Sequence, residues 1–402
     1  MMNRPHRETF LLAVTLAALA AAVVFAPLAA AQSFTDVGSG HWAKSAIDWV
    51  TNQGPAGNKV LDDYAGAFKP EQAITRAQLA RALVIASGHE GETVASRVIP
   101  DMPPDMHPYY WDVQLALHYG FMGLITKSGV KGFYPDAACT ASKAEVAIVR
   151  WLKRTHTSTD WSMLTKLKSG TWEPAEGWRP SVPSYFQYVT ASRALQLKFN
   201  HSTDGDAHEV TPNQAIDRAE VAYMFRKAYA ASGSLWGIPK YAAVTLPPLS
   251  ARQKQVLQYA FKYVGYPYIW AGEWPTKNSP YGAQAAGGFD CSGFTFYVMQ
   301  CHFGYPVTGR GAGDQAKLAS PRIGRGSLKP GDLIFFGYDG VKSSVSQIYH
   351  AGIYMGNGWF IHSTGSSDGV TITRFSETYN DYWKTHFAWG RRLLKASELV
   401  VV

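Results

Sequence analysis

The chain has 402 residues, enough for two or three domains with their own cores, and a composition of 46% hydrophobic and 17% charged residues excludes a disordered protein. The formal net charge is +8, but the basic residues are scattered without a run of five or more, which argues against a nucleic-acid-binding protein. A mild positive excess suits an anionic polymer or a membrane surface as partner, or serves only solubility.

Residues 1–31 have the parts of a secretory signal peptide. Two arginines form a positive start, residues 10–31 are almost wholly apolar, and Ala29-Ala30-Ala31 offers small residues at a cleavage site. The apolar run is also long enough to span a membrane, but Pro27 and the alanine-rich end favour cleavage. We therefore expect an exported protein that keeps no stable membrane anchor once the signal is cleaved.

Residues 32–232 contain an internal repeat with a period of roughly 65–75 residues. The clearest copies are FKPEQAITRAQLARAL from residue 68, FYPDAACTASKAEVAIV from residue 133 and VTPNQAIDRAEVAYMF from residue 210. Each has a helix-capping residue, then a basic residue, then apolar residues at helical spacing. The first half of each copy also predicts a helix, so each unit should pack two helices on its neighbours. We place the units at residues 32–90, 91–157 and 158–232.

The signatures ITRAQ, SKAE and DRAE, with the opening element FTDVGSGHWAKSAIDW, resemble three S-layer homology repeats. The resemblance implies an all-α repeat bundle with pseudo-three-fold symmetry. It also implies grooves that bind an anionic secondary cell-wall polymer through the basic residues, here Arg76, Lys143 and Arg218. The second copy has two extra residues before Lys143, and a lysine does not reproduce the bidentate contact of an arginine. The alternative is that these residues only cap helices and form surface pairs.

Residues 233–250 are rich in glycine and proline and lack periodicity, which predicts a linker. A second domain is expected over residues 251–396. It starts with an amphipathic helix, ARQKQVLQYAFKYVG, and its last part predicts five strands, at residues 332–339, 350–356, 358–364, 369–375 and 386–394. A helical half followed by consecutive strands predicts an α+β domain with an antiparallel sheet.

The stretch FDCSGFTFYVMQC, residues 289–301, holds two of the three cysteines of the chain. As a helix it separates Cys291 from Cys301 by about 15 Å along the axis, too far for a disulfide, which needs Cα atoms within about 7 Å. Cys301 falls on the apolar face and suits a core residue. Cys291 lies in the first turn after Asp290, where the helix dipole and free amides lower a thiol pKa. From the residues alone, Cys291 is either a nucleophile or a buried core cysteine.

A thiolate nucleophile needs a base that a third polar group orients. Two histidines lie in adjacent predicted strands, His350 in YHAGIYMG and His362 in WFIHST. The other histidines lack such a setting. His350 and His362 are therefore the candidates for the base and its orienting group.

The turn between these two strands decides whether the histidines can meet. A plain two-residue turn at Asn357-Gly358 would put them on opposite faces, because side chains alternate along a strand. A three-residue loop over residues 356–358 would pair Met355 with Trp359 and put both histidines on one face. That loop needs a left-handed third residue, which Gly358 supplies. We therefore expect the three-residue loop, a type I turn with a bulge at Gly358.

The segments GYPYIWAG, FDCSGF, LKPGDLIFF and HAGIYMGNGWFIHS resemble, in the right order, the motifs of NlpC-type cell-wall peptidases, a papain-like family. The resemblance covers nearly all of residues 251–396. It implies that Cys291 is the nucleophile, that His350 is the general base, and that His362 orients His350. It also implies that the hydroxyl of Tyr268 lies near the oxyanion, although this tyrosine could also be a packing aromatic.

Asp290 and Ser292 match positions that hold the polar end of the peptide stem in some members of that family. Their alternative roles are the cap and the start of the helix. Two departures from the family pattern lie nearby. Ala271 stands where the family has a glycine, and extra residues between Tyr268 and Cys291 lengthen the loop beside the site, which puts the reach of Tyr268 in doubt.

Together the resemblances imply a secreted, wall-anchored peptidoglycan hydrolase of the cell wall or cell surface. The implied activity is that of a cysteine endopeptidase that cleaves the stem peptide, typically between γ-D-glutamate and the next diamino acid, through a thioester. The implied partners are the stem peptide and the anionic wall polymer. No metal or organic cofactor is implied, and residues 204–209, DGDAHE, lack calcium-loop spacing. The alternatives are a Cys-His amidase or acyltransferase, and a catalytically silent wall-binding protein.

Overall fold

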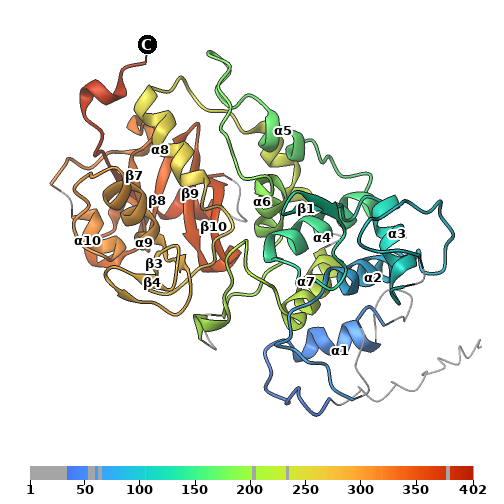
Figure 1. The fold of residues 1–402 in the computed structure, drawn as a ribbon. Helices are drawn as coiled ribbons and strands as arrows, with labels where there is room; N and C mark the ends of the chain where they lie inside the picture. The colour runs from blue at the N-terminus through green and yellow to red at the C-terminus, as the bar shows by residue number, and fades with distance from the viewer. Residues whose placement is uncertain are drawn as a thin grey trace, which may run out of the picture. The chain divides into compact units, whose positions relative to one another are not determined.

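The computed structural model describes residues 34–52, 59–61, 66–104, 106–201, 205–231, 235–317, 319–376 and 381–401 (Figure 1). The predicted signal peptide lies outside these residues. None of the helices in these ranges combines the length and the apolar character that a membrane span requires.

The three predicted repeat units are helical, apart from a short hairpin. The elements are α1 (Lys44–Asn52), α2 (Arg76–Ala86), α3 (Tyr110–His118), β1 (Ile125–Lys127), β2 (Val130–Gly132), α4 (Ala141–Thr155), α5 (Met163–Ser169), α6 (Phe186–Ala194) and α7 (Arg218–Ala231). Helix α3 packs on α2, α6 on α4 and α1 on α7. Each first-half helix thus packs on the second-half helix of another unit, as expected for repeats that cannot bury their apolar faces alone.

The segments that lead into α2, α4 and α7 pair with one another through single β-bridges. Ala73 is bridged to Asp217, and the segments at residues 75 and 138 and at residues 140 and 215 are bridged likewise. Each segment therefore contacts the other two. Thr75 caps α2 through a capping box, in which its side chain accepts a hydrogen bond from the amide of Gln78.

The connection at residues 233–250, predicted to be a linker, is packed over the part described from residue 235. It forms two short 3₁₀ helices, Leu235–Gly237 and Pro239–Ala243, and the side chains of Ile238 and Val244 are fully buried. The Tyr241 hydroxyl donates a hydrogen bond to the carbonyl of Ile372. Residues 239–243 also contact α5, and the ring of Tyr241 packs against that of Trp359 in the second domain. The predicted linker thus contacts both of the regions that it joins.

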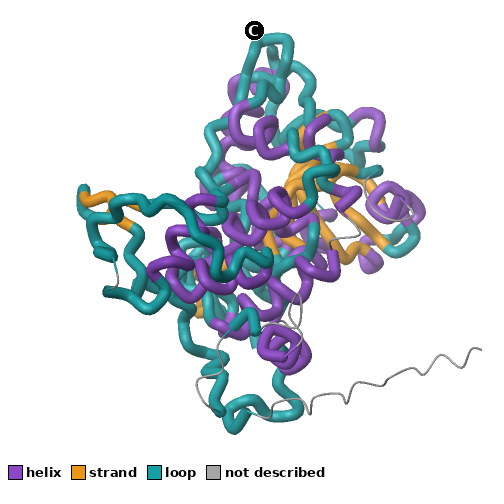
Figure 2. Tube along the Cα trace, turned by 90° about the vertical axis from the view of Figure 1, so that its right-hand side faces the viewer, coloured by secondary structure: helices purple, strands orange, loops and turns teal. Residues whose placement is uncertain are grey.

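The second domain has the predicted antiparallel sheet. Its strands are β7 (Leu333–Gly337), β8 (Ile348–Gly356), β9 (Trp359–Thr364), β10 (Gly369–Arg374) and β11 (Phe387–Arg391), in the order β10-β9-β8-β7-β11. The helices are α8 (Ala251–Phe261), α9 (Cys291–Phe296), α10 (Ala312–Ala316) and α11 (Tyr382–His386). Helices α9 and α10 both contact β8, and the sheet with its surrounding helices can be followed in Figure 2.

Four short strands occupy the loop before α9. They are β3 (Glu273–Trp274), β4 (Asn278–Ser279), β5 (Gly282–Ala283) and β6 (Gly288–Phe289). Strand β3 pairs with β6, and β4 pairs with β5. The side chain of Gln284 bonds to the backbone of both Trp274 and Gly288, so the extra residues of this loop fold onto the domain.

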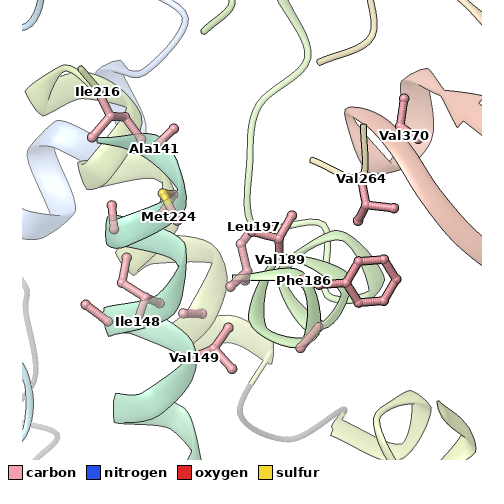
Figure 3. Packing of buried hydrophobic residues seen from close by; sticks show 14 of the residues in the cluster. Ala141, Ile148, Val149, Phe186, Val189, Leu197, Ile216, Met224, Val264 and Val370 are labelled. Atoms are coloured by element: carbon pink, nitrogen blue, oxygen red, sulfur yellow. The ribbon is translucent and has the colours of Figure 1, made fainter. Parts of the chain in front are cut away.

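Apolar side chains from both parts of the chain belong to one core. In Figure 3, Val264 and Val370 of the second domain lie in the same cluster as Phe186 and Val189 of α6, and all four are fully buried. Residues 32–402 accordingly form one compact unit.

The β8–β9 hairpin has a two-residue turn, so the predicted three-residue loop is wrong. Gly356 pairs with Trp359, and Asn357 and Gly358 have φ angles of 50° and 84°, the signs of a type I′ turn. An extra residue, Met355, then shifts the register of the remaining pairs. This bulge produces the register that the longer loop was expected to give, so the histidines still share one face.

We predict that Gly358→Val lowers the free energy of unfolding by about 1–2 kcal/mol, because a β-branched residue is strained at a positive φ. The nearest atom that an added Cβ would meet, Arg374 Cγ, is 3.6 Å away, so backbone strain and not a clash should carry the effect. Denaturant unfolding measures it. Gly324→Val is the matched control, because Gly324 has an ordinary φ of −70° and open space around it. If both variants lost the same free energy of unfolding, the result would contradict a strained, left-handed position at Gly358 in the turn.

Candidate active site

Cys291 is the first residue of α9, as predicted. Asp290 caps the helix, since its Oδ1 accepts hydrogen bonds from the Gly293 amide at 2.6 Å and from the Ser292 hydroxyl at 2.9 Å. Only glycine fits at residue 293, because an added Cβ would lie 2.0 Å from the carbonyl oxygen of Gly272. The start of α9 is thus pressed against the preceding loop, and the amide of Cys291 lies in the first turn, where intrahelical partners are lacking.

The thiol lies against the backbone of β8 on both sides of His350. Its Sγ is 3.9 Å from the carbonyl oxygen of Tyr349, and the amide of Ala351 also interacts with it. These two backbone groups flank His350 on β8. Burial, and then the charge of Asp290, raises the pKa of Cys291 to about 12. The expected lowering by the helix N-terminus is outweighed by burial, so the thiol is neutral near pH 7.

The two predicted histidines meet directly. The Nε2 of His350 lies 2.7 Å from the Nδ1 of His362, and the Nε2 of His362 lies 3.2 Å from the Oγ1 of Thr373. His350 and His362 are both buried. Burial lowers the pKa of His350 to about 3, and burial together with His350 lowers the pKa of His362. Both imidazoles are therefore neutral near pH 7.

Two tautomer arrangements satisfy this row of bonds, because the Thr373 hydroxyl can donate or accept, and only one of them leaves His350 able to accept a proton. With His350 Nε2–H donating to His362 and His362 Nε2–H donating to Thr373, every hydrogen bond in the row has one donor and one acceptor. The Nδ1 of His350 then keeps its lone pair. This nitrogen is the one that remains to take a proton from a neighbouring thiol.

Sequence reasoning missed Thr373 and Trp383. The alternation in GVTITRF puts Thr371 and Thr373 on the opposite face from the buried Val370 and Ile372, and this pattern could have indicated a polar partner. The ring centroid of Trp383 lies 4.8 Å from that of His350 and 5.0 Å from that of His362. This ring packs against both imidazoles and restricts their movement.

Tyr268 lines the same cavity as Cys291, so the longer loop does not carry it away from the site. It is bridged to Phe289, two residues before the nucleophile. Burial, then the charge of Cys291, raises the pKa of Tyr268, which keeps the hydroxyl protonated as a donor. Ala271, at the family's glycine position, has a φ of 57°, a left-handed conformation that glycine adopts without strain.

The cavity over Cys291 has a volume of about 380 Å³. Asp290 and Ser292 line it, and so do Arg310 and Glu273, which form an ion pair that sequence reasoning missed. The cavity thus offers a nucleophile at its floor and groups of both charges at its wall. Among the described residues, no group of three or more potential ligands is placed to hold a metal ion.

The structure places Arg76 and Lys143 at one cavity and Arg218 elsewhere, against Phe68. Arg76 is buried and donates to the carbonyls of Phe133 and Gly123, and Arg218 is fully buried and donates to the carbonyl of Phe68. Both arginines therefore join segments of the repeats. A cavity of about 490 Å³ is lined by Arg76, Lys143, Arg150 and Lys168 among others.

Comparison with known families agrees with this geometry. Residues 265–392 match the NlpC/P60 family, and residues 33–80 match the S-layer homology domain. The second match falls within the first of the three predicted units. The second and third units rest on the sequence pattern and on the packing described above.

Three bacterial relatives are similar over part of the chain. The gamma-DL-glutamyl hydrolase of Bacillus subtilis (strain 168) is 34% identical over 47% of this chain and 39% of its own length. The murein DD-endopeptidase MepH of Escherichia coli (strain K12) is 28% identical over 52% of this chain and 70% of its own length. The gamma-D-glutamyl-L-lysine dipeptidyl-peptidase of Bacillus subtilis (strain 168) is 32% identical over 34% of this chain and 40% of its own length.

A solved structure of an NlpC/P60 family protein from Bacillus cereus ATCC 10987 is 30% identical. The matched region covers 37% of this chain and 42% of the chain in that structure, with a TM-score of 0.29. The chain spans less than half the length of two of the three relatives. The second domain therefore matches the NlpC/P60 family over residues 265–392, and the chain carries an S-layer homology match at its start.

Proposed function

We propose that the protein is a cysteine endopeptidase that hydrolyses the stem peptide of peptidoglycan. The observation that carries this proposal is the position of the Cys291 thiol, at a helix N-terminus and against β8 on both sides of His350, whose Nε2 is held by His362. The NlpC/P60 match and relatives named as murein and glutamyl peptidases support it.

The reaction starts from a neutral thiol and a neutral imidazole. As Sγ of Cys291 attacks the scissile carbonyl, its proton passes to Nδ1 of His350, so nucleophile and base act in one step. The amide of Cys291 and the hydroxyl of Tyr268 donate to the oxyanion. Collapse of the tetrahedral intermediate transfers the proton from His350 to the leaving amine and leaves a thioester on Cys291.

The second half of the reaction uses the same groups. His350 takes a proton from water, the resulting hydroxide attacks the thioester, and the second tetrahedral intermediate expels the Cys291 thiolate, which recovers the proton. Each time His350 is protonated, the hydrogen bond from its Nε2–H to Nδ1 of His362 strengthens. The hydrogen bond between His362 and Thr373 fixes the His362 ring in the orientation that accepts this bond. His362 is therefore an orienting group that stabilises the imidazolium.

The bond cleaved is, in this proposal, the one between γ-D-glutamate and the next diamino acid. Two of the relatives are named for γ-glutamyl bonds. Arg310 lines the cavity, with its guanidinium paired to Glu273 on one side and half exposed, and a γ-linked D-glutamate keeps its α-carboxylate free to bind the remaining donors. Asp290 already caps α9 and binds the Ser292 hydroxyl, so these two residues shape the cavity and contact substrate only through atoms that capping leaves unused.

The repeat region, in this proposal, anchors the enzyme on an anionic secondary polymer of the cell wall. The S-layer homology match and the ring of bridges among the three signature segments support a bundle of three units. The cavity lined by Lys143, Arg150 and Lys168 gathers positive charge. We place the polymer there, and the protein outside the cell at the wall.

Digestion of purified peptidoglycan tests the enzymatic function. The full chain should release fragments with a new amino-terminal diamino acid, identified by mass spectrometry, and a Cys291→Ala chain should release none. Identical fragments from both would contradict an enzyme and leave a wall-binding protein. Release of the whole stem peptide from the sugar would indicate an amidase, and new peptide linkages would indicate an acyltransferase.

We predict that Lys143→Glu combined with Lys168→Glu weakens binding to wall sacculi that bear the polymer at least several-fold, because phosphate- or carboxylate-rich polymers bind through charge. Sedimentation measures the bound fraction, in a Cys291→Ala background that keeps the sacculi intact. Lys329→Glu combined with Lys384→Glu makes the same change of net charge on the second domain and should leave binding unaltered. Equal loss from both pairs, or equal binding to sacculi stripped of the polymer, would refute this polymer site.

We predict that the free energy of unfolding falls as the pH drops below about 6.5, the ordinary histidine pKa. His350 keeps a lowered pKa of about 3 in the folded protein, so below pH 6.5 protons bind to the unfolded chain first and favour it. Each buried histidine contributes up to about 1.4 kcal/mol per pH unit. Denaturant unfolding between pH 7 and 5 measures the slope.

His362→Gln should make this slope shallower, whereas His118→Gln, at an exposed position, should leave it as it is. An unchanged slope after His362→Gln would show that the buried pair does not stay neutral.

A further inference from the structure

A group of buried charged side chains lies where the third repeat unit meets the sheet. Five come from the repeats and one, Asp368, comes from the turn between β9 and β10. They are Glu145, Arg193, Lys198, Glu209, Glu220 and Asp368. Buried ion pairs stabilise a fold less than apolar packing of the same volume. These charged side chains therefore matter more for holding segments of the two regions in fixed positions than for adding stability.

Arg193 joins the end of α6 to two loops of the second domain. Its Nη2 donates to the carbonyl of Gly265 at 2.8 Å, and its Nη1 donates to Oδ2 of Asp368 at 3.3 Å. Lys198 reaches the same Asp368 oxygen at 3.2 Å. The side chains of Arg193, Lys198 and Asp368 are each 1% exposed. These bonds therefore hold Gly265 and the β9–β10 turn at fixed positions relative to the repeats.

Gly265 begins the segment that carries Tyr268. This segment is bonded on one side to β10, through the amide of Val370 and the carbonyl of Tyr266 at 2.9 Å, and on the other to Phe289, whose amide donates to Pro267 at 3.1 Å. It thus lies between the edge of the sheet and the strand that leads to Cys291. A shift of its first residue would move the Tyr268 hydroxyl relative to the thiol.

The third unit also bonds the far end of the segment. Oδ2 of Asp206 accepts a hydrogen bond from the amide of Trp270 at 2.6 Å, and Asp206 is only 7% exposed. The side-chain amide of Asn200 donates to the carbonyl of Gly365 at 3.1 Å. Trp270 lines the cavity over Cys291. Residues before and after Tyr268 are therefore both held by the third unit.

We propose that the third repeat unit is a working part of the peptidase site, in which Arg193 and Asp206 are positioning residues that fix the segment 265–270 and, through it, the Tyr268 hydroxyl. This inference rests on the proposed function. A displacement of about 1 Å in an oxyanion donor is enough to slow a reaction up to about 100-fold. Loss of these contacts should lower kcat and leave KM nearly unchanged, because the hydroxyl acts on the transition state.

The test uses the full chain and a soluble peptide containing the γ-D-glutamyl–diamino acid bond. Asp206→Ala should lower kcat about 10-fold or more. Asp206→Asn should restore most of it, since the amide oxygen can still accept from Trp270. Asp101→Ala is the matched control, because Asp101 bonds the amide of Phe133 within the repeats; it should leave kcat unaltered.

A double variant separates positioning from general damage. In a Tyr268→Phe background, Asp206→Ala should slow the enzyme less than two-fold, because the hydroxyl that Asp206 positions is already gone. An equal slowing in both backgrounds would overturn the inference, and so would an unchanged kcat in Asp206→Ala. Arg193→Gln should behave as Asp206→Ala does, with thermal unfolding used to confirm that each variant is folded at the assay temperature.

The two proposals fail in different ways. If the unaltered chain does not hydrolyse the peptide, the proposed function is wrong. If it does, and the Asp206 and Arg193 variants match the Asp101 control, only the role of the third unit is wrong.

Discussion

The 2.7 Å contact between His350 and His362 is the interaction on which the proposed active site depends, and one inserted residue in β8 makes it possible. With a type I′ turn and an uninterrupted ladder, the two side chains would point to opposite faces of the sheet. The bulge at Met355 shifts the register of the strand pairs that lie beyond the tight turn. The hairpin therefore combines a turn that matches strand twist with a pairing that serves catalysis.

Burial then fixes the protonation states of the site. Cys291 and both histidines lie in a low-dielectric interior, and burial is the largest influence on each pKa. Charge separation into thiolate and imidazolium is thus disfavoured in the resting state. The third group is a neutral histidine bonded to Thr373, and a neutral group favours a resting imidazolium less than a carboxylate would. In the proposed mechanism, the proton therefore moves when the substrate supplies an oxyanion for the donors around Cys291.

The order of motifs and the alternation of strands predicted the sheet, the helix at Cys291 and the meeting of the two histidines. The turn residues alone did not predict the loop length of the β8–β9 hairpin, because a bulge depends on how the strands pair and not on the residues of the turn. Composition predicted a connection at residues 233–250 but not its packing, because burial of a few apolar side chains such as Ile238 and Val244 depends on their distant partners. Thr373 bonds His362 across two paired strands, and Arg193 bonds Gly265 and Asp368, which are 72 and 175 residues away. A single sequence carries only their local pattern and not their partners.

In the proposed function, two surfaces of the repeats have different roles. Arg76 and Arg218 donate hydrogen bonds to carbonyls of neighbouring segments, whereas Lys143, Arg150 and Lys168 line the cavity at which we propose that the polymer binds. On another side, α6 and the turn at Asp206 hold the loops of the second domain. Since one core runs through both regions, a wall-bound anchor would hold the catalytic cavity at a set orientation to the polymer. The two regions are joined through a packed connection, so the proposed anchoring and the proposed positioning of the catalytic site would both be properties of one folded unit.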